Sequence, residues 1–137
     1  MRIAIVGAGP AGLYLAYLLK RRGAGVSVRV FEQNPAHATF GFGVVFSDRA
    51  LEFLRDDDPE TYEAVTPAME SWSDITLDLN GQVMRIDGVG FSAIGRLELL
   101  RLLQARVRAV GIDIAFQRPI GSLRELPTRT SSSGRTA

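Results

Sequence analysis

The sequence predicts an α/β fold that begins with a βαβ unit, and three observations support this. A short β-branched run at residues 3–6 ends in glycines, as a buried strand of a parallel sheet does. Good helix formers follow from Pro10 to Arg22. An alternating run at residues 26–31 then arrives within the roughly 30 residues that a βαβ unit occupies. The 137-residue chain, 46% hydrophobic and 23% charged, therefore suits one soluble globular domain.

The first strand and helix have clear ends. Residues 3–6 are all apolar, so we expect this strand to be buried on both faces of the sheet. Pro10 stands in the first turn of the helix, where its missing N–H is harmless. The last turn carries Lys20, Arg21 and Arg22, which we expect to be solvated side chains that complement the helix dipole.

A glycine-rich loop at residues 40–43 leads to a second helical region. Ser47 is a plausible N-cap for a helix that ends near Leu54. Asp58 is expected to cap a short helix with Pro59 at its first position. The three aspartates at 56–58 predict no metal site, because side chains on a turn diverge and hard cations need several converging oxygens.

The remaining elements are a β-hairpin insertion, a helix and a third strand. Residues 72–87 alternate between apolar and polar side chains around Asn80 and Gly81, and Asn-Gly is the strongest short hairpin signal. Apolar residues recur at steps of three and four from Arg96 to Val110, which indicates an amphipathic helix. Residues 112–116 then predict a short strand that joins the parallel sheet.

Residues 1–126 are therefore expected to form the domain, and residues 127–137 a disordered tail of polar residues. We hypothesise that this tail results from a shifted reading frame. If serines 131–133 are encoded by TCN codons, the frame that starts one base earlier reads three NTC codons, which encode only Phe, Leu, Ile or Val. Such a run would supply a further strand of the kind that parallel sheets contain.

Composition excludes several classes of function. The 16 basic and 15 acidic residues nearly balance, so we expect neither nucleic-acid nor membrane binding. The absence of cysteine excludes disulfides, thiol catalysis and thiolate metal sites, and it fits a cytoplasmic protein. His37 is the single histidine, and we expect it to be a solvated side chain rather than a catalytic base. We do not expect the apolar start to be a signal peptide, because glycines interrupt it and basic residues follow it.

A dinucleotide-binding motif follows the first strand and opens the first helix. It satisfies G-x-G-x-x-G and lies 20 residues before Glu32, at the end of the second strand. The motif consists of Gly7, Ala8, Gly9, Pro10, Ala11 and Gly12.

Each part of this motif has a physical task. Gly7 permits the tight turn, Gly9 lets a pyrophosphate approach the backbone, and Gly12 lets the helix pack closely on the sheet. Free N–H groups and the positive end of the helix dipole would stabilise the phosphates. Glu32 would accept hydrogen bonds from ribose hydroxyls and disfavours a 2′-phosphate, which leaves FAD or NAD as the ligand.

With a Rossmann-like unit in place, the sequence resembles the class A flavoprotein monooxygenases related to para-hydroxybenzoate hydroxylase. It is similar in particular to hydroxylases of aromatic CoA thioesters, of the salicylyl-CoA and 2-aminobenzoyl-CoA type. The resemblance covers residues 1–126. It rests on residues 7–12 with Glu32, on the segment 40–47, and on Gly95-Arg96-Leu97 with Leu100.

The resemblance implies a FAD site whose ADP side is held by residues 7–12, Glu32 and Gln33. It also implies that Arg96 reaches the phosphates and that the Gly41 to Ser47 loop, with Gly43, lies near the flavin ring. In the complete enzymes NAD(P)H reduces FAD, and dioxygen supplies one oxygen atom to a small aromatic substrate. Two later FAD motifs of the family, an Asp-Gly and a Gly-Asp pair, are absent, so the FAD-binding domain is incomplete and no catalytic residue is assigned.

Three functions remain open at this point. The chain could be part of such a monooxygenase, an NAD-binding or FAD-binding module of another oxidoreductase, or an inactive truncated product. The segment 41–47 and the hairpin favour the first over a plain NAD domain, which would pass quickly to its next parallel strand and helix. The substrate, the choice between NADH and NADPH, and the oligomeric state are left open.

Overall fold

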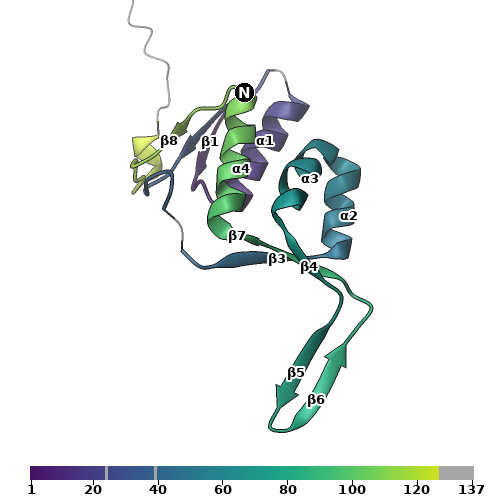
Figure 1. Cartoon of the computed structure of the whole chain (residues 1–137). Helices are drawn as coiled ribbons and strands as arrows, with labels where there is room; N and C mark the ends of the chain where they lie inside the picture. Colours follow the sequence, from purple (N-terminus) through teal and green to yellow (C-terminus); the bar gives the residue numbers. More distant parts are fainter. Residues whose placement is uncertain (24, 39, 127–137) are drawn as a thin grey trace, which may run out of the picture.

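The computed structural model describes residues 1–23, 25–38 and 40–126 (Figure 1). The expected tail at 127–137, with the hypothesis of a shifted reading frame, lies outside these residues. The elements, in chain order, are β1 (Arg2–Val6), α1 (Pro10–Arg22), β2 (Ser27–Phe31), β3 (Gly43–Ser47), α2 (Asp48–Asp57), α3 (Pro59–Val65), β4 (Glu70–Trp72), β5 (Ile75–Leu79), β6 (Gln82–Ile86), β7 (Phe91–Gly95), α4 (Arg96–Ala109) and β8 (Ile114–Ala115), with short 3₁₀ turns at Thr66–Ala68 and Leu123–Glu125.

The predicted α/β fold and its βαβ unit are confirmed. The strands β1, β2 and β8 form a parallel sheet in the order β1-β2-β8. Ile3 pairs with Val28 across β1 and β2, and Val30 pairs with Ile114 across β2 and β8. The third predicted strand therefore joins the sheet beside β2, although it is shorter than expected.

One face of this sheet holds the main hydrophobic core, and α1 and α4 lie side by side over it (Figure 1). Leu13 of α1, Val30 of β2 and Val107 of α4 are fully buried there. The expectation that β1 is buried on both faces is wrong, because its side chains alternate and Val6 is 57% exposed. Both helices cover the same face, and no described element covers the other face of β1.

A second sheet was not predicted. The strands β3, β7 and β4 form an antiparallel sheet in the order β3-β7-β4. The segment expected to be a loop from Gly41 to Ser47 is therefore a strand from Gly43 onward. The β-branched pair Val44 and Val45 could have indicated this strand. Trp72, which was expected in the hairpin, lies in β4 and stacks on Phe91 of β7.

The caps of α2 and α3 are as predicted. The Ser47 side chain accepts a hydrogen bond from the Ala50 amide at 3.3 Å, and α2 continues three residues past the expected end. The Asp58 side chain accepts a hydrogen bond from the Thr61 amide at 3.3 Å, with Pro59 at the first helical position.

The basic end of α1 is more than a solvated helix end, which corrects the expectation. Arg21 forms a 2.9 Å salt bridge with the fully buried carboxylate of Asp58. Arg106 of α4 stacks over the Tyr17 ring and lies 3.8 Å from the same carboxylate. The N-cap of α3 is thus tied to both α1 and α4.

The predicted hairpin is confirmed as β5 and β6, and it projects away from the rest of the structure (Figure 1). Asn80 and Gly81 both have positive φ, 54° and 84°, as a two-residue hairpin turn requires. No described helix combines the length and the apolar character that crossing a membrane would need.

Candidate dinucleotide site

The glycine turn between β1 and α1 has the geometry that the motif predicts. Gly7 has φ of 105°, a conformation that favours glycine. A Cβ atom at Gly12 would overlap the carbonyl oxygen of Gly7, so only glycine lets α1 begin this close to the turn. A Cβ at Gly9 would meet nothing within 4 Å, so the space in front of Gly9 is open to a ligand.

Glu32 lies at the end of β2 and connects the glycine turn to the next segment. Its Oε2 accepts a hydrogen bond from the Ala8 amide at 2.7 Å. Its Oε1 accepts two from Asn34, one from the backbone amide and one from the side chain, both at 2.9 Å. The Ala8 N–H is therefore directed at Glu32, which differs from the expectation that the turn offers its amides to phosphate.

These hydrogen bonds stabilise the charged form of Glu32. Partial burial favours the neutral carboxyl, but the hydrogen bonds from Ala8 and Asn34 outweigh it and hold the pKa of Glu32 below its ordinary value of 4.5. Glu32 is thus a carboxylate at neutral pH, which can accept hydrogen bonds from ribose hydroxyls and repels an added phosphate.

A cavity of about 100 Å³ opens beside this carboxylate, and it brings together Ala8, Gly9, Glu32 and Arg96 of the predicted site. Its lining residues come from the segments that follow β1, β2 and β8 and from α4. The other lining residues are Asn34, Pro35, Ala36, Ala38, Phe40, Leu100, Gln104 and Phe116.

Arg96 supplies the positive charge at this cavity. It is the first residue of α4, and its backbone amide donates to the Phe42 carbonyl at 3.1 Å. Its Nε atom is buried and has no hydrogen-bond partner in the described part of the chain. A buried guanidinium nitrogen usually has a hydrogen-bond partner, and an anionic ligand could supply one. An anion would also offset the unfavourable placement of a positive charge at the N-terminus of a helix. The residues present therefore fit the phosphates of a dinucleotide.

The other predicted site residues do not line this cavity. Pro10 and Ala11 line a different, apolar cavity. Gln33 is exposed. Gly43 lies in β3, where a Cβ would come within 3.1 Å of the Ile94 carbonyl oxygen, so close strand pairing accounts for this glycine.

Sequence reasoning missed Asn34 and Gln104. Asn34 makes two hydrogen bonds to Glu32, and no motif marks it. Gln104 was detectable, because Arg96, Leu100 and Gln104 recur at four-residue steps and so share one face of the helix.

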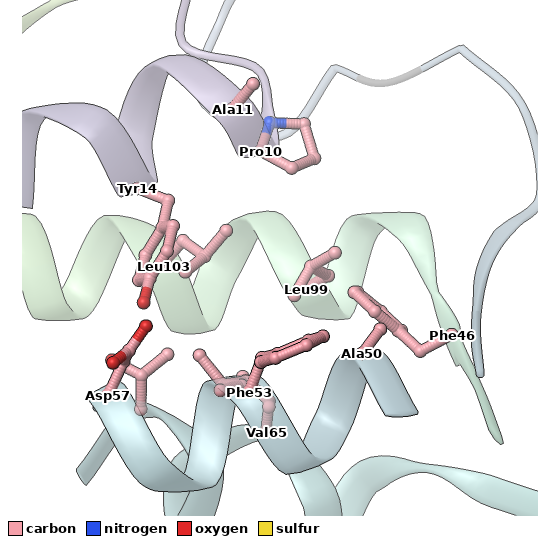
Figure 2. Close-up of a pocket in the computed structure, with 12 residues that line it drawn as sticks. Pro10, Ala11, Tyr14, Phe46, Ala50, Phe53, Asp57, Val65, Leu99 and Leu103 are labelled. Carbon is pink, nitrogen blue, oxygen red and sulfur yellow. The ribbon is translucent and has the colours of Figure 1, made fainter. Parts of the chain in front are cut away.

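A larger apolar cavity of about 380 Å³ lies between α1, α2, α3 and α4 (Figure 2). Figure 2 shows the hydroxyl of Tyr14 directed toward Asp57 at one end, while Phe46 and Phe53 lie toward the other. Burial, followed by the charges of Asp58 and Asp57, raises the pKa of Tyr14 above its ordinary value of 10.0. No cationic side chain lines this cavity, so it lacks what dinucleotide phosphates need. The described residues also contain no group of three or more His, Cys, Asp or Glu side chains that could hold a metal ion.

Known proteins resemble this chain in sequence. Salicyloyl-CoA 5-hydroxylase from Streptomyces sp is 44% identical over 126 residues, which are 92% of this chain and 24% of that protein. The 3-hydroxy-4-methyl-anthranilyl-[aryl-carrier protein] 5-monooxygenase from Streptosporangium sibiricum is 30% identical over 82% of this chain and 32% of its own length. The 3-amino-4-hydroxybenzoate 2-monooxygenase from Streptomyces cremeus is 32% identical over 83% of this chain and 31% of its own length. The chain thus spans a quarter to a third of these relatives.

Solved structures share the fold. A tetrameric form of 2-methyl-3-hydroxypyridine-5-carboxylic acid oxygenase superposes with a TM-score of 0.71 at 24% identity, over 85% of this chain and 31% of that one. The sequence profile of the family described as "FAD binding domain" matches residues 1–131. Together with the glycine turn, Glu32 and Arg96, these matches show that the chain belongs to the FAD-binding domain family of the class A flavin monooxygenases.

Proposed function

We propose that this chain forms the ADP-binding side of the FAD site of a flavin-dependent monooxygenase. The observation that carries the proposal is the cavity at which the carboxylate of Glu32, the open space at Gly9 and the unpaired Nε of Arg96 meet. We further propose an aromatic substrate, and an aryl-CoA thioester in particular, because the names of the relatives describe aromatic substrates and one describes a CoA thioester.

Each residue has a distinct part in this proposal. Gly9 leaves room for the pyrophosphate at the N-terminus of α1, where the helix dipole favours negative charge. Arg96 donates to a phosphate, and Glu32 accepts from the adenosine ribose. When bound, FAD supplies the redox chemistry by which NAD(P)H and dioxygen hydroxylate an aromatic ring. We propose Gln33 and Gly43 only as neighbours of the cofactor and assign no catalytic residue.

The size of the cavity sets the expected affinity. A volume of about 100 Å³ cannot enclose a flavin ring, so the ring would stay in water and its burial energy would be lost. We therefore expect the 137-residue chain to bind ADP and FAD with similar, weak affinities.

The experiment compares two glycines. A Cβ meets nothing within 4 Å at either Gly9 or Gly25, so neither Gly9→Ala nor Gly25→Ala should disturb the fold. Gly9→Ala places a methyl group where the pyrophosphate would lie and should weaken ADP binding in calorimetry by about tenfold or more. Gly25→Ala, at the far end of α1, should bind ADP like the unmodified chain.

Equal ADP affinity in both variants would exclude the glycine turn as the phosphate site. Titration with FAD, FMN and NADH tests the ligand class. Binding of FAD and ADP without FMN supports an ADP-side site, whereas a clear preference for NADH over FAD would favour an NAD-binding module.

A further inference from the structure

We propose that Gln104 is a positioning residue for this site, and the proposal rests on the function proposed above. The buried amide of Gln104 holds the turn of residues 34–38 against α4. This turn forms one wall of the cavity, so Gln104 would fix the surface that the adenosine part of the ligand contacts.

Gln104 is a polar residue in an apolar setting. It is only 6% exposed, and its helix neighbours Leu100, Leu103 and Val107 belong to the hydrophobic core. Burying an amide without hydrogen bonds is costly, so a buried glutamine needs a specific partner. Its Nε2 donates to the carbonyl oxygen of Ala36 at 2.9 Å.

Other hydrogen bonds that hold this turn, among the described residues, come from its own backbone, from the segment after β8 and from Asn34 to Glu32. The Ala38 amide donates to the Pro35 carbonyl at 3.0 Å, and the Gln117 amide donates to the Asn34 carbonyl at 3.2 Å. Within the described ranges, Gln104 is the side chain that hydrogen-bonds the turn to α4. Among the described residues, the Ala36 carbonyl has no other hydrogen-bond donor.

This contact is continuous with the ligand-binding groups. Asn34, in the same turn, donates twice to the Glu32 carboxylate, which in turn accepts from the Ala8 amide. A chain of hydrogen bonds therefore runs from α4 through the turn and Glu32 to the glycine loop. Arg96 and Gln104 share one face of α4. This helix face therefore carries the positive charge of Arg96 and also holds the turn of residues 34–38, which forms another wall of the cavity.

The test replaces Gln104 in the full 137-residue chain. Gln104→Leu places an apolar side chain of similar size in the core and removes the hydrogen-bond donor to the Ala36 carbonyl. We expect ADP affinity in calorimetry to fall about threefold to tenfold, the size of one lost hydrogen bond. Hydrogen exchange at the Ala38 and Gln117 amides should also become faster. Gln82→Leu, in the exposed hairpin, is the matched control and should change neither quantity.

A second variant separates positioning from packing. In Gln104→Glu, burial beside Leu100, Leu103 and Val107 should raise the pKa of the introduced carboxyl. The neutral carboxyl can donate an O–H to the Ala36 carbonyl and the carboxylate cannot, so ADP affinity relative to the unmodified chain should be closer to one at pH 5 than at pH 8. Glu32, Arg96 and His37 are the charged and titratable groups of this region, and the ratio taken at each pH removes their own effect.

The outcomes distinguish the two proposals. An unmodified chain that does not bind ADP at all would contradict the proposed function itself. A folded Gln104→Leu that binds ADP as tightly as the unmodified chain would overturn only the role of Gln104, including the case in which exchange at Ala38 becomes faster. A pH-independent ratio for Gln104→Glu would count against positioning through the Ala36 carbonyl.

Discussion

The packed body of the molecule and the β5–β6 hairpin have similar apolar sequence patterns but opposite environments. In the body, formed by the two three-stranded sheets and the four helices, residues such as Leu13 and Val107 are fully buried. In the hairpin, Leu79 is 67% and Val83 is 65% exposed. A turn signal and an alternating pattern are therefore enough to define how the two strands pair. Apolar side chains add to the free energy of unfolding only where another helix or sheet packs on them and removes them from water.

The hairpin has one apolar face. Ile75 pairs with Ile86, and Leu77 pairs with Met84, on the same side of the two strands. Such cross-strand pairs contribute only about 0.2 to 1 kcal/mol each. We therefore expect the hairpin to open at a lower free energy than the body unfolds.

The largest contrast should come from leucine truncation. Leu13→Ala leaves a cavity in the core between α1 and the sheet and should lower the free energy of unfolding by about 2 to 5 kcal/mol. Leu79→Ala, in the exposed hairpin, should change it by less than about 0.5 kcal/mol. Chemical denaturation followed by circular dichroism measures both, and equal effects would show that the hairpin is as well packed as the body.

Removal of the Asp58 carboxylate should have the next largest effect. Asp58→Ala deletes the N-cap of α3 and leaves Arg21 without its acidic partner, so we expect a loss of about 2 to 3 kcal/mol. Asp58→Asn keeps a side-chain oxygen for the cap and should lose less. If the two variants are equally stable, the cap contributes nothing and the charge of Asp58 accounts for the whole effect.

The sequence predicted the elements whose signals are local. Pro10 at the start of α1, Ser47 and Asp58 as caps, and the Asn80-Gly81 turn all act through their own backbone neighbours, and all were located correctly. The antiparallel sheet was missed because β3 and β7 pair over more than 40 residues of chain. The exposed side of β1 was missed because burial depends on which face the helices cover.

The sequence likewise predicted some residues of the site but not the contacts that join them. Glu32 and Arg96 were found from motifs and do meet at one cavity. The hydrogen bond from Ala8 to Glu32 and the contact from Gln104 to Ala36 join residues 24 and 68 positions apart, so neither could be inferred from spacing alone.

Two glycine substitutions test whether the hairpin and the body unfold separately. Gly12→Ala would force a Cβ into the Gly7 carbonyl oxygen and should destabilise the body by about 1 to 3 kcal/mol, the usual range for overpacking. Gly81→Ala strains a turn with φ of 84° by about 1 kcal/mol, and this strain should open only the hairpin. Thermal unfolding should register the first change, and hydrogen exchange in β5 and β6 should register the second. A fall in the global melting temperature with Gly81→Ala would mean that hairpin and body unfold together.

The smallest effect concerns pH and tests whether Glu32 contributes to the body as well as to the ligand site. Its pKa in the folded state lies below the ordinary 4.5, so its hydrogen bonds stabilise the fold above that pH. This contribution is lost as the pH falls through the lower folded-state pKa. Glu32→Gln should therefore cost about 1 kcal/mol at pH 7, a net value suited to partly exposed hydrogen bonds, and less at pH 3. The difference in free energy of unfolding between the two proteins, measured by urea denaturation from pH 7 to pH 3, isolates Glu32 from the other carboxylates. Asp78→Asn, at the hairpin turn, is the control and should leave the global stability unchanged over the whole range. A difference near zero over the whole pH range would show that the Glu32 carboxylate does not stabilise the fold, and that its hydrogen bonds to Ala8 and Asn34 serve the ligand site alone.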